Sequence, residues 1–573
     1  MIKTLYQQWL NEPRLEAELK KELVEMTESD MSEAFYKPLT FGTGGMRGIV
    51  GVGINRMNIY TVRKAIQGYA LFLLKTNPNA KEHGVVIAYD NRHFSQDFAK
   101  AAVEVLAKNG IQAYLFEAIR PTPLLSYAVR DTHAAGGIMV TASHNPPQYN
   151  GVKMYDSDGC QLIPRLADQV IELVNDIDDV FSIETMPFDI AKAQGLVEIL
   201  GRNMDNKYLN DVYQVQYYPN ISKLLKVVFT PLHGASREIG LRSLVENGYD
   251  VYPVEAQMIA DPNFSTVKSP NPEDVHAFAM AEALGKEKSA DLLIATDPDG
   301  DRLGVAVYHD KKYHYLTGNQ TGALFIDYML KTLSENDALP PQGVLFNTIV
   351  TNDFGAAIAR HYGVEMVSTL TGFKFIGEKM KAIENSDKTF IMGYEESYGY
   401  VLKDIVRDKD SIQAIVLISE MANRLKQEGK TLIDALNTLY DTHGAYRDQL
   451  VNIALEGQAG EKAINQIMQA FRKNAMTSFL NRSLIYKEDY QLGERYENGQ
   501  TSVLNFPQSD VLKFMYEDFW FVLRPSGTEP KLKIYCIHKG KTIAEADAFL
   551  ETLKAELIDL VEQYQTKNEE VNR

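Results

Sequence analysis

Short apolar runs that alternate with helical stretches restrict the fold of this chain more than any other feature of its sequence. Each run is too short for a buried helix and ends in a polar loop, which is typical of a buried strand. Strands that alternate with helices, such as the stretch from Ser95 to Lys108, predict α/β units. We expect three such units in succession, with strands that include Val85–Tyr89, Gln112–Phe116, Ile138–Val140, Lys226–Thr230, Asp291–Thr296, Val344–Ile349 and Thr389–Met392.

The length of the chain requires more than these units. A chain of 573 residues is too long for one hydrophobic core, and at roughly 150 residues per domain it suggests about four domains. An N-terminal helical arm precedes the first unit. A charged helical stretch is expected from Leu432 to Ala475, before a smaller final unit with strands at Phe521–Leu523 and Leu532–Cys536 and a long helix that begins at Ile543.

An excess of acidic residues limits the partners of the protein. The chain contains 59 lysines and arginines and 76 aspartates and glutamates, so its net charge is −17. This charge disfavours sequence-independent binding to nucleic acid or to anionic lipid. Cys160 and Cys536 are far apart and form no CxxC pair, which disfavours a zinc site or a disulfide scaffold. Since we find neither a signal peptide nor an apolar run near the ~18 residues that span a bilayer, we expect a cytoplasmic protein.

The stretch Thr141-Ala142-Ser143-His144-Asn145-Pro146 follows the apolar run at Ile138–Val140 and therefore places Ser143 on a loop at the end of a strand. A serine hydrolase is disfavoured, because the glycine-flanked serine of the strand-to-helix elbow is missing and Ala142 and His144 stand where that elbow needs small residues. A polar loop with a purely structural role remains the alternative for this stretch taken alone.

Three carboxylates follow another apolar run, in Asp297-Pro298-Asp299-Gly300-Asp301-Arg302. Their alternate spacing lets them converge on one hard cation, which prefers oxygen ligands. A calcium loop of the EF-hand type is excluded, because Arg302 and Tyr308 stand where that loop needs glycine and glutamate. A solvated acidic turn is the alternative, although three acids so close together repel one another unless something neutralises them.

Further loops carry groups suited to phosphates and sugars. Arg47 ends the glycine-rich stretch 41–48, and Lys153 lies on a short strand after an expected turn at Asn150-Gly151. Glu395 and Glu396 stand between glycines at a strand end and offer acceptors to sugar hydroxyls. Lys409, at an expected helix start, could face an anion, and Arg524-Pro525-Ser526-Gly527-Thr528 forms a compact donor set for a phosphate. Each of these loops alone could equally be a plain turn.

Taken together and in order, these loops resemble those of the α-D-phosphohexomutase family, from Phe41 to Cys536. The stretch around Ser143 is similar to the phosphoserine loop of that family, and the stretch 297–302 to its metal loop. Glu395-Glu396-Ser397 resembles its sugar-binding loop and the stretch 524–528 its phosphate-binding loop. The forms of stretches 41–48, 372–374 and 394–399 look most like the long phosphoglucomutase/phosphopentomutase branch.

The resemblance implies three related α/β domains with mixed sheets and a smaller α+β C-terminal domain around a central cleft. We place the four domains at 1–205, 206–315, 316–450 and 451–573. The resemblance also implies Mg²⁺ held by phosphorylated Ser143 and the three aspartates, Asp297, Asp299 and Asp301. The implied catalytic residues are Ser143, His144, Lys153 and Arg47, and the implied substrate-binding residues are Arg302, Thr371, Gly372, Lys374, Glu395, Ser397, Lys409, Arg524, Ser526, Gly527 and Thr528.

The function implied is that of an isomerase that interconverts glucose 1-phosphate and glucose 6-phosphate through glucose 1,6-bisphosphate. Lys153 or His144 would handle the proton, with Lys153 favoured. Phosphopentomutase or glucose 1,6-bisphosphate synthase activity is the alternative within this class of enzyme, and a non-catalytic protein that binds sugar phosphates is the alternative outside it. The expected partners are small sugar phosphates, with no nucleic acid or membrane, and the protein is expected to be a monomer or a small homo-oligomer.

Overall fold

The computed structural model describes residues 2–39, 41–42, 45–455, 457–474, 476–526 and 531–571. The chain forms two compact units, Met1–Phe346 with Gly372–Ile433, and Asn347–Thr371 with Asp434–Arg573. Each unit is described by itself below.

The first sheet, in the first unit, has the strand order β1-β2-β6-β5-β3-β4-β7. Its inner strands β3, β4 and β5 are parallel, and β6 and β2 run antiparallel to their neighbours, so the sheet is mixed. The strands are β1 (Phe41–Gly42), β2 (Gly45–Ile49), β3 (Val85–Tyr89), β4 (Ala113–Phe116), β5 (Gly136–Val140), β6 (Tyr149–Tyr155) and β7 (Val197–Leu200).

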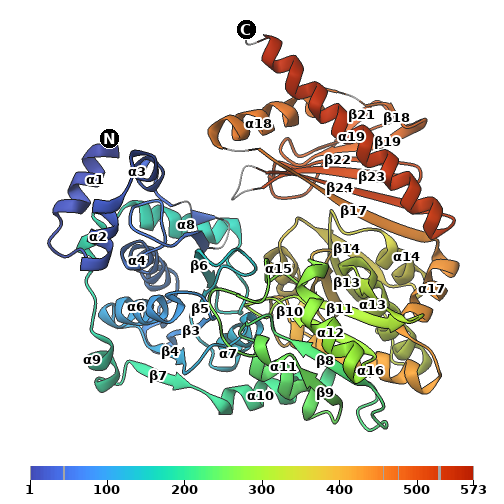
Figure 1. Ribbon diagram of the computed structural model, residues 1–573, viewed down its shortest axis with the longest axis horizontal. Helices are drawn as coiled ribbons and strands as arrows, with labels where there is room; N and C mark the ends of the chain where they lie inside the picture. The colour runs from blue at the N-terminus through green and yellow to red at the C-terminus, as the bar shows by residue number, and fades with distance from the viewer. Residues whose placement is uncertain are drawn as a thin grey trace. The chain divides into compact units, whose positions relative to one another are not determined.

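Helices α4, α6 and α8 pack with this sheet around one buried core, and α7 packs against β3 and β5 (Figure 1). The N-terminal arm has its own small core, in which Trp9 packs edge-on against Phe35 and Tyr60. The helices are α1 (Ile2–Asn11), α2 (Ala17–Glu25), α3 (Glu28–Phe35), α4 (Ile59–Thr76), α5 (Ala80–His83), α6 (Ser95–Lys108), α7 (Thr122–Asp131), α8 (Pro164–Asn175), α9 (Phe188–Ala193) and α10 (Arg202–Val212).

A second mixed sheet of the first unit has the order β12-β11-β10-β8-β9. Its central strand β10 is parallel to β8 and antiparallel to β11, and all five residues of β10 are buried. The elements are β8 (Lys226–Thr230), α11 (Arg237–Val245), β9 (Asp250–Pro253), α12 (Ala279–Lys288), β10 (Leu292–Thr296), β11 (Leu303–His309) and β12 (Lys312–Leu316). Short 3₁₀ helices lie at Val180–Ser182, Tyr213–Val215, Glu255–Gln257 and Val275–Phe278.

The third sheet pairs β13 in parallel with β15, and β15 in antiparallel with β16. The boundary between the two units passes through β13, after Phe346. The elements are α13 (Gly318–Glu335), β13 (Gly343–Thr348), α14 (Phe354–His361), β14 (Glu365–Thr369), α15 (Phe373–Ile383), β15 (Thr389–Glu395), β16 (Gly399–Val401), α16 (Ser411–Gln427) and α17 (Leu432–His443).

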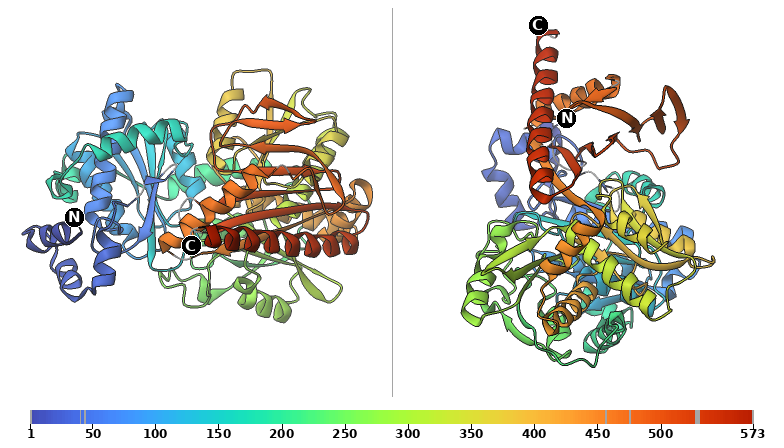
Figure 2. Two further views of the ribbon diagram at one scale, coloured as in Figure 1. Left: turned by 90° about the horizontal axis from the view of Figure 1, so that it is seen from above. Right: turned by 90° about the vertical axis from the view of Figure 1, so that its right-hand side faces the viewer.

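The second unit contains a large antiparallel sheet with the path β17-β24-β23-β22-β19-β20-β21, and β18 pairs with β19. Helices α18 (Gly457–Lys473) and α19 (Ile543–Val571) lie against it, and Figure 2 shows α19 running along the sheet. The strands are β17 (Ala445–Ala454), β18 (Ser478–Phe479), β19 (Arg482–Asp489), β20 (Glu494–Glu497), β21 (Gln500–Val503), β22 (Leu512–Tyr516), β23 (Phe519–Pro525) and β24 (Lys531–Gly540).

One sequence expectation fails in this region. The stretch from Leu432 to Ala475 was expected to be helical, but β17 interrupts it at Ala445–Ala454. The ten residues of β17 pair one by one with β24, from Ala445 opposite Gly540 to Ala454 opposite Lys531. This long-range pairing outweighs the local helical pattern, because strand formation depends strongly on the neighbouring strand.

Candidate active site

Ser143 lies just beyond β5, on the strand-end loop that the sequence predicted. Its backbone N–H donates to Thr141 Oγ1 at 2.8 Å, and its φ of 51° lies in the left-handed region that side chains other than glycine rarely adopt. The side-chain hydroxyl donates to Asp297 Oδ2 at 2.9 Å and lies 3.2 Å from His144 Nδ1. The structure therefore brings the serine, the histidine and the first aspartate together.

The three aspartates occupy the connection between β10 and β11. At least one carboxylate oxygen of each lies within 4.8 Å of the others, and all three residues are buried. The loop is built around Asp297, whose Oδ1 accepts from the backbone N–H groups of Asp301 and Arg302, both at 3.1 Å.

Backbone contacts from distant segments fix this loop. The N–H of Thr122, at the start of α7, donates to Asp299 O at 2.8 Å, and Ser411 Oγ, at the start of α16, donates to Gly300 O at 2.6 Å. Gly300 has a φ of 65°, and an added Cβ would lie 2.7 Å from Pro121 Cβ, so the turn requires glycine. Two helix starts therefore fix the backbone of the acidic loop.

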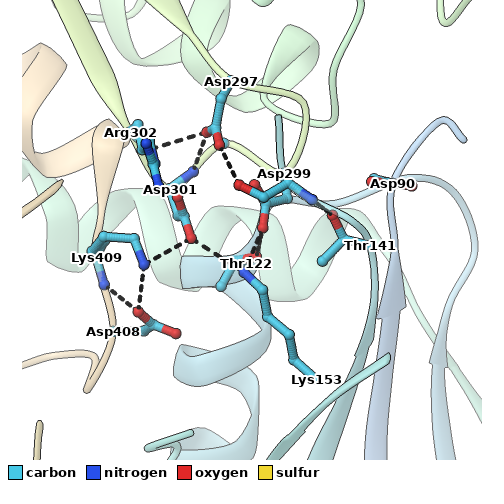
Figure 3. Close-up of polar contacts among 12 residues, drawn as sticks. Asp90, Thr122, Thr141, Lys153, Asp297, Asp299, Asp301, Arg302, Asp408 and Lys409 are labelled. Carbon is cyan, nitrogen blue, oxygen red and sulfur yellow. Dashed lines mark hydrogen bonds and ion pairs between the residues drawn. The ribbon is translucent and has the colours of Figure 1, made fainter. Parts of the chain in front are cut away.

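Two lysines face the aspartates, as Figure 3 shows. Lys153 Nζ lies 2.7 Å from Asp299 Oδ2 and 3.3 Å from Asp301 Oδ2, and Lys409 Nζ lies 3.0 Å from Asp301 Oδ2. Burial lowers the pKa of each lysine, but the neighbouring carboxylates raise it by more than burial lowers it. Both pKa values therefore lie above the ordinary value for lysine. The two lysines therefore stay positively charged. Their two charges do not balance three carboxylates, so a further cation is needed to neutralise the site.

The carboxyl groups of Asp297 and Asp299 differ in the direction of their pKa shifts. Burial raises the pKa of Asp297 well above its usual range, and the neighbouring charges of Asp299 and Asp301 raise it further. Burial also acts to raise the pKa of Asp299, but the charge of Lys153 and the other contacts of this carboxyl together outweigh it, and the pKa of Asp299 is lowered. Asp297 and Asp299 therefore do not both ionise readily without an additional positive charge.

The unpaired oxygens of the trio test whether it fits a metal ion. Within the described part of the chain, Asp299 Oδ1 and Asp301 Oδ1 are buried and have no hydrogen-bond partner. A buried carboxylate oxygen without a partner is costly, and a hard divalent cation is the partner that removes the cost. The residues fit a metal of the Mg²⁺ type, as the sequence predicted.

Lys153 reaches the acids from β6, where the sequence predicted a turn at Asn150-Gly151. That prediction is wrong, because β6 is continuous from Tyr149 to Tyr155 and pairs with both β2 and β5. A Cβ on Gly151 would lie 2.7 Å from both Met46 O and Thr141 O. The glycine serves a close approach of strands and not a turn.

Arg47 lies on β2, opposite Gly151 in the sheet register. Its Nη1 donates to Asn145 Oδ1 at 2.6 Å, so the arginine contacts the loop that carries Ser143. Thr43 and Gly44 of the preceding glycine-rich stretch lie outside the described residues.

The expected sugar-binding loop is the turn between β15 and β16. Glu395 is buried, and its Oε1 accepts from the Gly372 N–H at 2.8 Å. The Leu303 N–H donates to Tyr398 O at 3.0 Å, and Arg302 pairs with Gly399 as an isolated bridge, so this turn is joined to the metal loop.

The remaining residues expected at the site lie in different parts of the structure. Ser397 is partly exposed within the same turn, and Lys374 lies buried at the start of α15. Arg302 forms an ion pair with Glu273. Thr371 directly precedes Gly372 and belongs to the second compact unit.

The predicted phosphate-binding loop also belongs to the second unit. Arg524 is the penultimate residue of β23 and is partly exposed, and the Ser526 N–H donates to Lys531 O at 2.8 Å. Gly527 and Thr528 lie outside the described residues. The contribution of this loop to the site thus stays a prediction.

Sequence reasoning missed two residues that support the site. Thr122 Oγ1 donates to Asp299 Oδ2 at 3.1 Å. Asp408 is buried, lies 3.4 Å from Lys409 Nζ, and accepts from Tyr155 Oη at 2.8 Å. The position of Asp408 beside Lys409 at a helix start could have indicated a role, whereas nothing in the sequence around Thr122 pointed to the site.

Four family models match the chain in order. Phosphoglucomutase/phosphomannomutase α/β/α domains I, II and III match residues 38–181, 206–310 and 317–443, and the C-terminal domain of that family matches residues 450–550. The chain belongs to the phosphoglucomutase/phosphomannomutase family. The predicted family and fold class are confirmed, and the protein is a phosphohexomutase, an enzyme of the isomerase class.

Curated relatives of the family support this assignment. A phosphoglucomutase of Staphylococcus aureus strain bovine RF122 / ET3-1 is 39% identical over 515 residues, which cover 88% of this chain and 90% of the relative. That of strain USA300 is 39% identical over 520 residues, which cover 89% and 91%.

Solved structures share the fold. A putative phosphomannomutase from Thermus thermophilus aligns with a TM-score of 0.67 at 22% identity, over 91% of this chain and 99% of that one. The open form of pp63/parafusin, a phosphoglucomutase from Paramecium, aligns with a TM-score of 0.67 at 17% identity, over 92% and 96%.

Membership of this family implies a metal ion, in agreement with the aspartate trio. Among the residues that the structure describes, no helix is both long and apolar enough to cross a bilayer.

Proposed function

We propose that this phosphohexomutase interconverts glucose 1-phosphate and glucose 6-phosphate, with Ser143 as the residue that carries the phosphoryl group. The observation that supports the proposal best is the contact of Ser143 Oγ with Asp297 Oδ2, 2.9 Å apart at the edge of the buried acidic trio. A phosphoryl group on that oxygen would lie beside carboxylates suited to a divalent cation and within reach of two lysines.

The donor set supplies what phosphoryl transfer needs. Catalysis of this reaction relies on positioning and on neutralising charge on the transferring group. A divalent cation on Asp297, Asp299 and Asp301 would stabilise that charge when bound. Arg47 contacts Asn145 of the serine loop from β2, so a further positive charge lies at that loop.

The attacking hydroxyl must also lose its proton. Two groups were expected to accept it, and Lys153 was favoured. In the structure His144 Nδ1 lies 3.2 Å from Ser143 Oγ, whereas Lys153 donates to Asp299 and Asp301. These contacts hold Lys153 on the acids, so His144, which lies beside the reacting oxygen, is the better placed of the two groups to take a proton at this site.

The reaction requires the sugar bisphosphate to reverse its orientation in the site between the two half-reactions. Phosphorylated Ser143 would transfer its group to the free hydroxyl of the sugar monophosphate, giving glucose 1,6-bisphosphate. The other phosphate would then return to Ser143. Glu395, beside Gly372, would hold ring hydroxyls in both orientations, and the phosphate-binding loop at Arg524 and Ser526 would hold the phosphate that is not reacting.

A serine substitution tests the proposal. Ser143→Ala removes the acceptor oxygen and leaves the three aspartates, so mutase turnover in a coupled glucose 6-phosphate dehydrogenase assay should fall below detection. Near-normal turnover of this variant would contradict the proposal. The ratio of kcat/KM for glucose 1-phosphate to that for ribose 1-phosphate tests the hexose preference separately, and the cytoplasmic location and the oligomeric state stay predictions.

A further inference from the structure

Arg92, which sequence reasoning did not single out, holds the loop that carries Ser143. It follows β3 on a strand-end segment, and its side chain is completely buried. Its Nη2 donates to Ser143 O at 2.6 Å and also to Asn145 O. Its Nη1 donates to Pro146 O at 2.9 Å and to Tyr149 O at 3.0 Å. One guanidinium therefore binds four backbone carbonyls of residues 143–149.

These contacts bear directly on the conformation of the serine. Ser143 has a φ of 51°, a left-handed conformation that costs roughly 1–2 kcal/mol for a residue with a Cβ. The carbonyl of Ser143 is one of the four that Arg92 binds. This hydrogen bond therefore offsets the conformational cost at the residue that carries it. Lysine could not bind four acceptors in this way, because only the planar fork of arginine presents several donors in a fixed geometry.

The guanidinium is itself held from two sides. Its Nε lies 3.4 Å from Asp90 Oδ2, and its central carbon lies 5.0 Å from the centre of the buried ring of Phe264. Asn91, the neighbour of Arg92, donates through Nδ2 to Asp261 O at 2.9 Å. Segment 261–264 lies between β9 and β10 of the second sheet in the sequence. It therefore supports the serine loop through its contacts with Asn91 and Arg92.

We propose that Arg92 is a positioning residue for phosphoryl transfer, which sets the place of Ser143 Oγ through backbone contacts without touching the transferring group. The inference rests on the proposed function. The loop places the hydroxyl next to Asp297 and His144, and a shift of about 1 Å at a reacting atom costs on the order of 100-fold in rate. Arg92 thus acts on the rate of the chemical step and not on the binding of the sugar.

The test uses Arg92→Lys in the full-length protein. The dephosphorylated enzyme is mixed with excess glucose 1,6-bisphosphate and Mg²⁺, and phosphorylation of Ser143 is followed by intact mass. This single-turnover rate constant does not depend on how much of the sample is folded, so a merely structural defect would not change it. We expect it to fall about 100-fold, while KM for glucose 1-phosphate changes less than about threefold.

Two further variants make the test specific. Arg424→Lys is the matched control, because Arg424 stacks on the ring of Tyr218 at 3.8 Å, far along the chain from the contacts that hold residues 143–149, so its single-turnover rate should equal that of the wild type. Phe264→Leu removes the aromatic ring that faces Arg92 and should slow the same step by about 2–30-fold, the effect of roughly 0.5–2 kcal/mol for a cation–π contact.

Hydrogen exchange separates this proposal from the proposed function. In Arg92→Lys, the amides of residues 141–149 should exchange faster than in the wild type, and those of β8 and β10 should not. If the wild-type serine is never phosphorylated, the proposed function fails while the exchange result still tests the hold of Arg92 on the loop. A single-turnover rate within about threefold of wild type, or unchanged exchange in residues 141–149, would overturn the inference.

Discussion

The charge balance around the aspartate trio makes a quantitative prediction for Lys153→Met. Lys153 Nζ lies 2.7 Å from Asp299 Oδ2 and 3.3 Å from Asp301 Oδ2, and its side chain is 11% exposed. At an effective dielectric constant of about 20, these two contacts correspond to gross attractions of about 6 and about 5 kcal/mol. Much of that is offset by desolvation, and the removal of one partner from a buried ion pair costs about 3–5 kcal/mol.

Metal should reverse most of this loss. Because a divalent cation neutralises the same carboxylates, we expect the local opening free energy of residues 292–303 to fall by about 3–5 kcal/mol in EDTA and by less than about 1 kcal/mol in saturating Mg²⁺. Amide exchange resolves this region separately from the rest of a large chain that does not unfold in one step.

A surface lysine provides the control. Lys207 Nζ lies 2.8 Å from Asp131 Oδ2, but its side chain is 59% exposed, so Lys207→Met should cost less than about 1 kcal/mol with or without metal. Equal losses in the two variants would refute the argument, as would a loss in Lys153→Met that Mg²⁺ leaves unchanged.

Three further predictions follow from the same structure. Burial, and then the charge of Asp158, raise the pKa of Asp156 to about 6, so the contribution of Asp156 to the free energy of unfolding should fall as pH rises from about 4 to about 6 and stay level above that. Asp156→Asn, which keeps an acceptor for the Asp158 and Cys160 N–H groups, should be more stable than the wild type at pH 7.5 and similar to it near pH 4, measured by thermal unfolding. Asp299→Asn should weaken Mg²⁺ binding at least tenfold by isothermal titration calorimetry, since a carboxylate ligand is worth more than about 1.4 kcal/mol, and equal affinity would contradict the metal site. Glu395→Gln should raise KM for glucose 1-phosphate about tenfold, the loss of one hydrogen bond to a charged group, and an unchanged KM would argue against its role with the sugar.

Local patterns in the sequence predicted much of the first unit. Helix α6 begins and ends at the expected residues, and Ser143 lies at the strand end where the apolar run placed it. These features depend on apolar periodicity and on the polar residues that end it, and both can be seen within a short window of sequence.

Features that depend on distant segments were not predictable in this way. The strand β17 forms because β24 lies beside it, and Gly151 is needed because β2 and β5 approach it from both sides. Arg92 binds backbone carbonyls, which leave no trace in the identity of the residues that carry them. The convergence of Ser143 with Asp297 could be expected only from the resemblance to a family.

The phosphorylation of Ser143 tests the central claim most directly. Purified protein incubated with glucose 1,6-bisphosphate and Mg²⁺ should gain one phosphoryl group, about 80 Da by intact mass. Peptide fragmentation should locate the group on Ser143, and the addition of glucose 1-phosphate should remove it. A phosphoryl group on another residue, or an unmodified Ser143 in protein that turns over normally, would contradict the account.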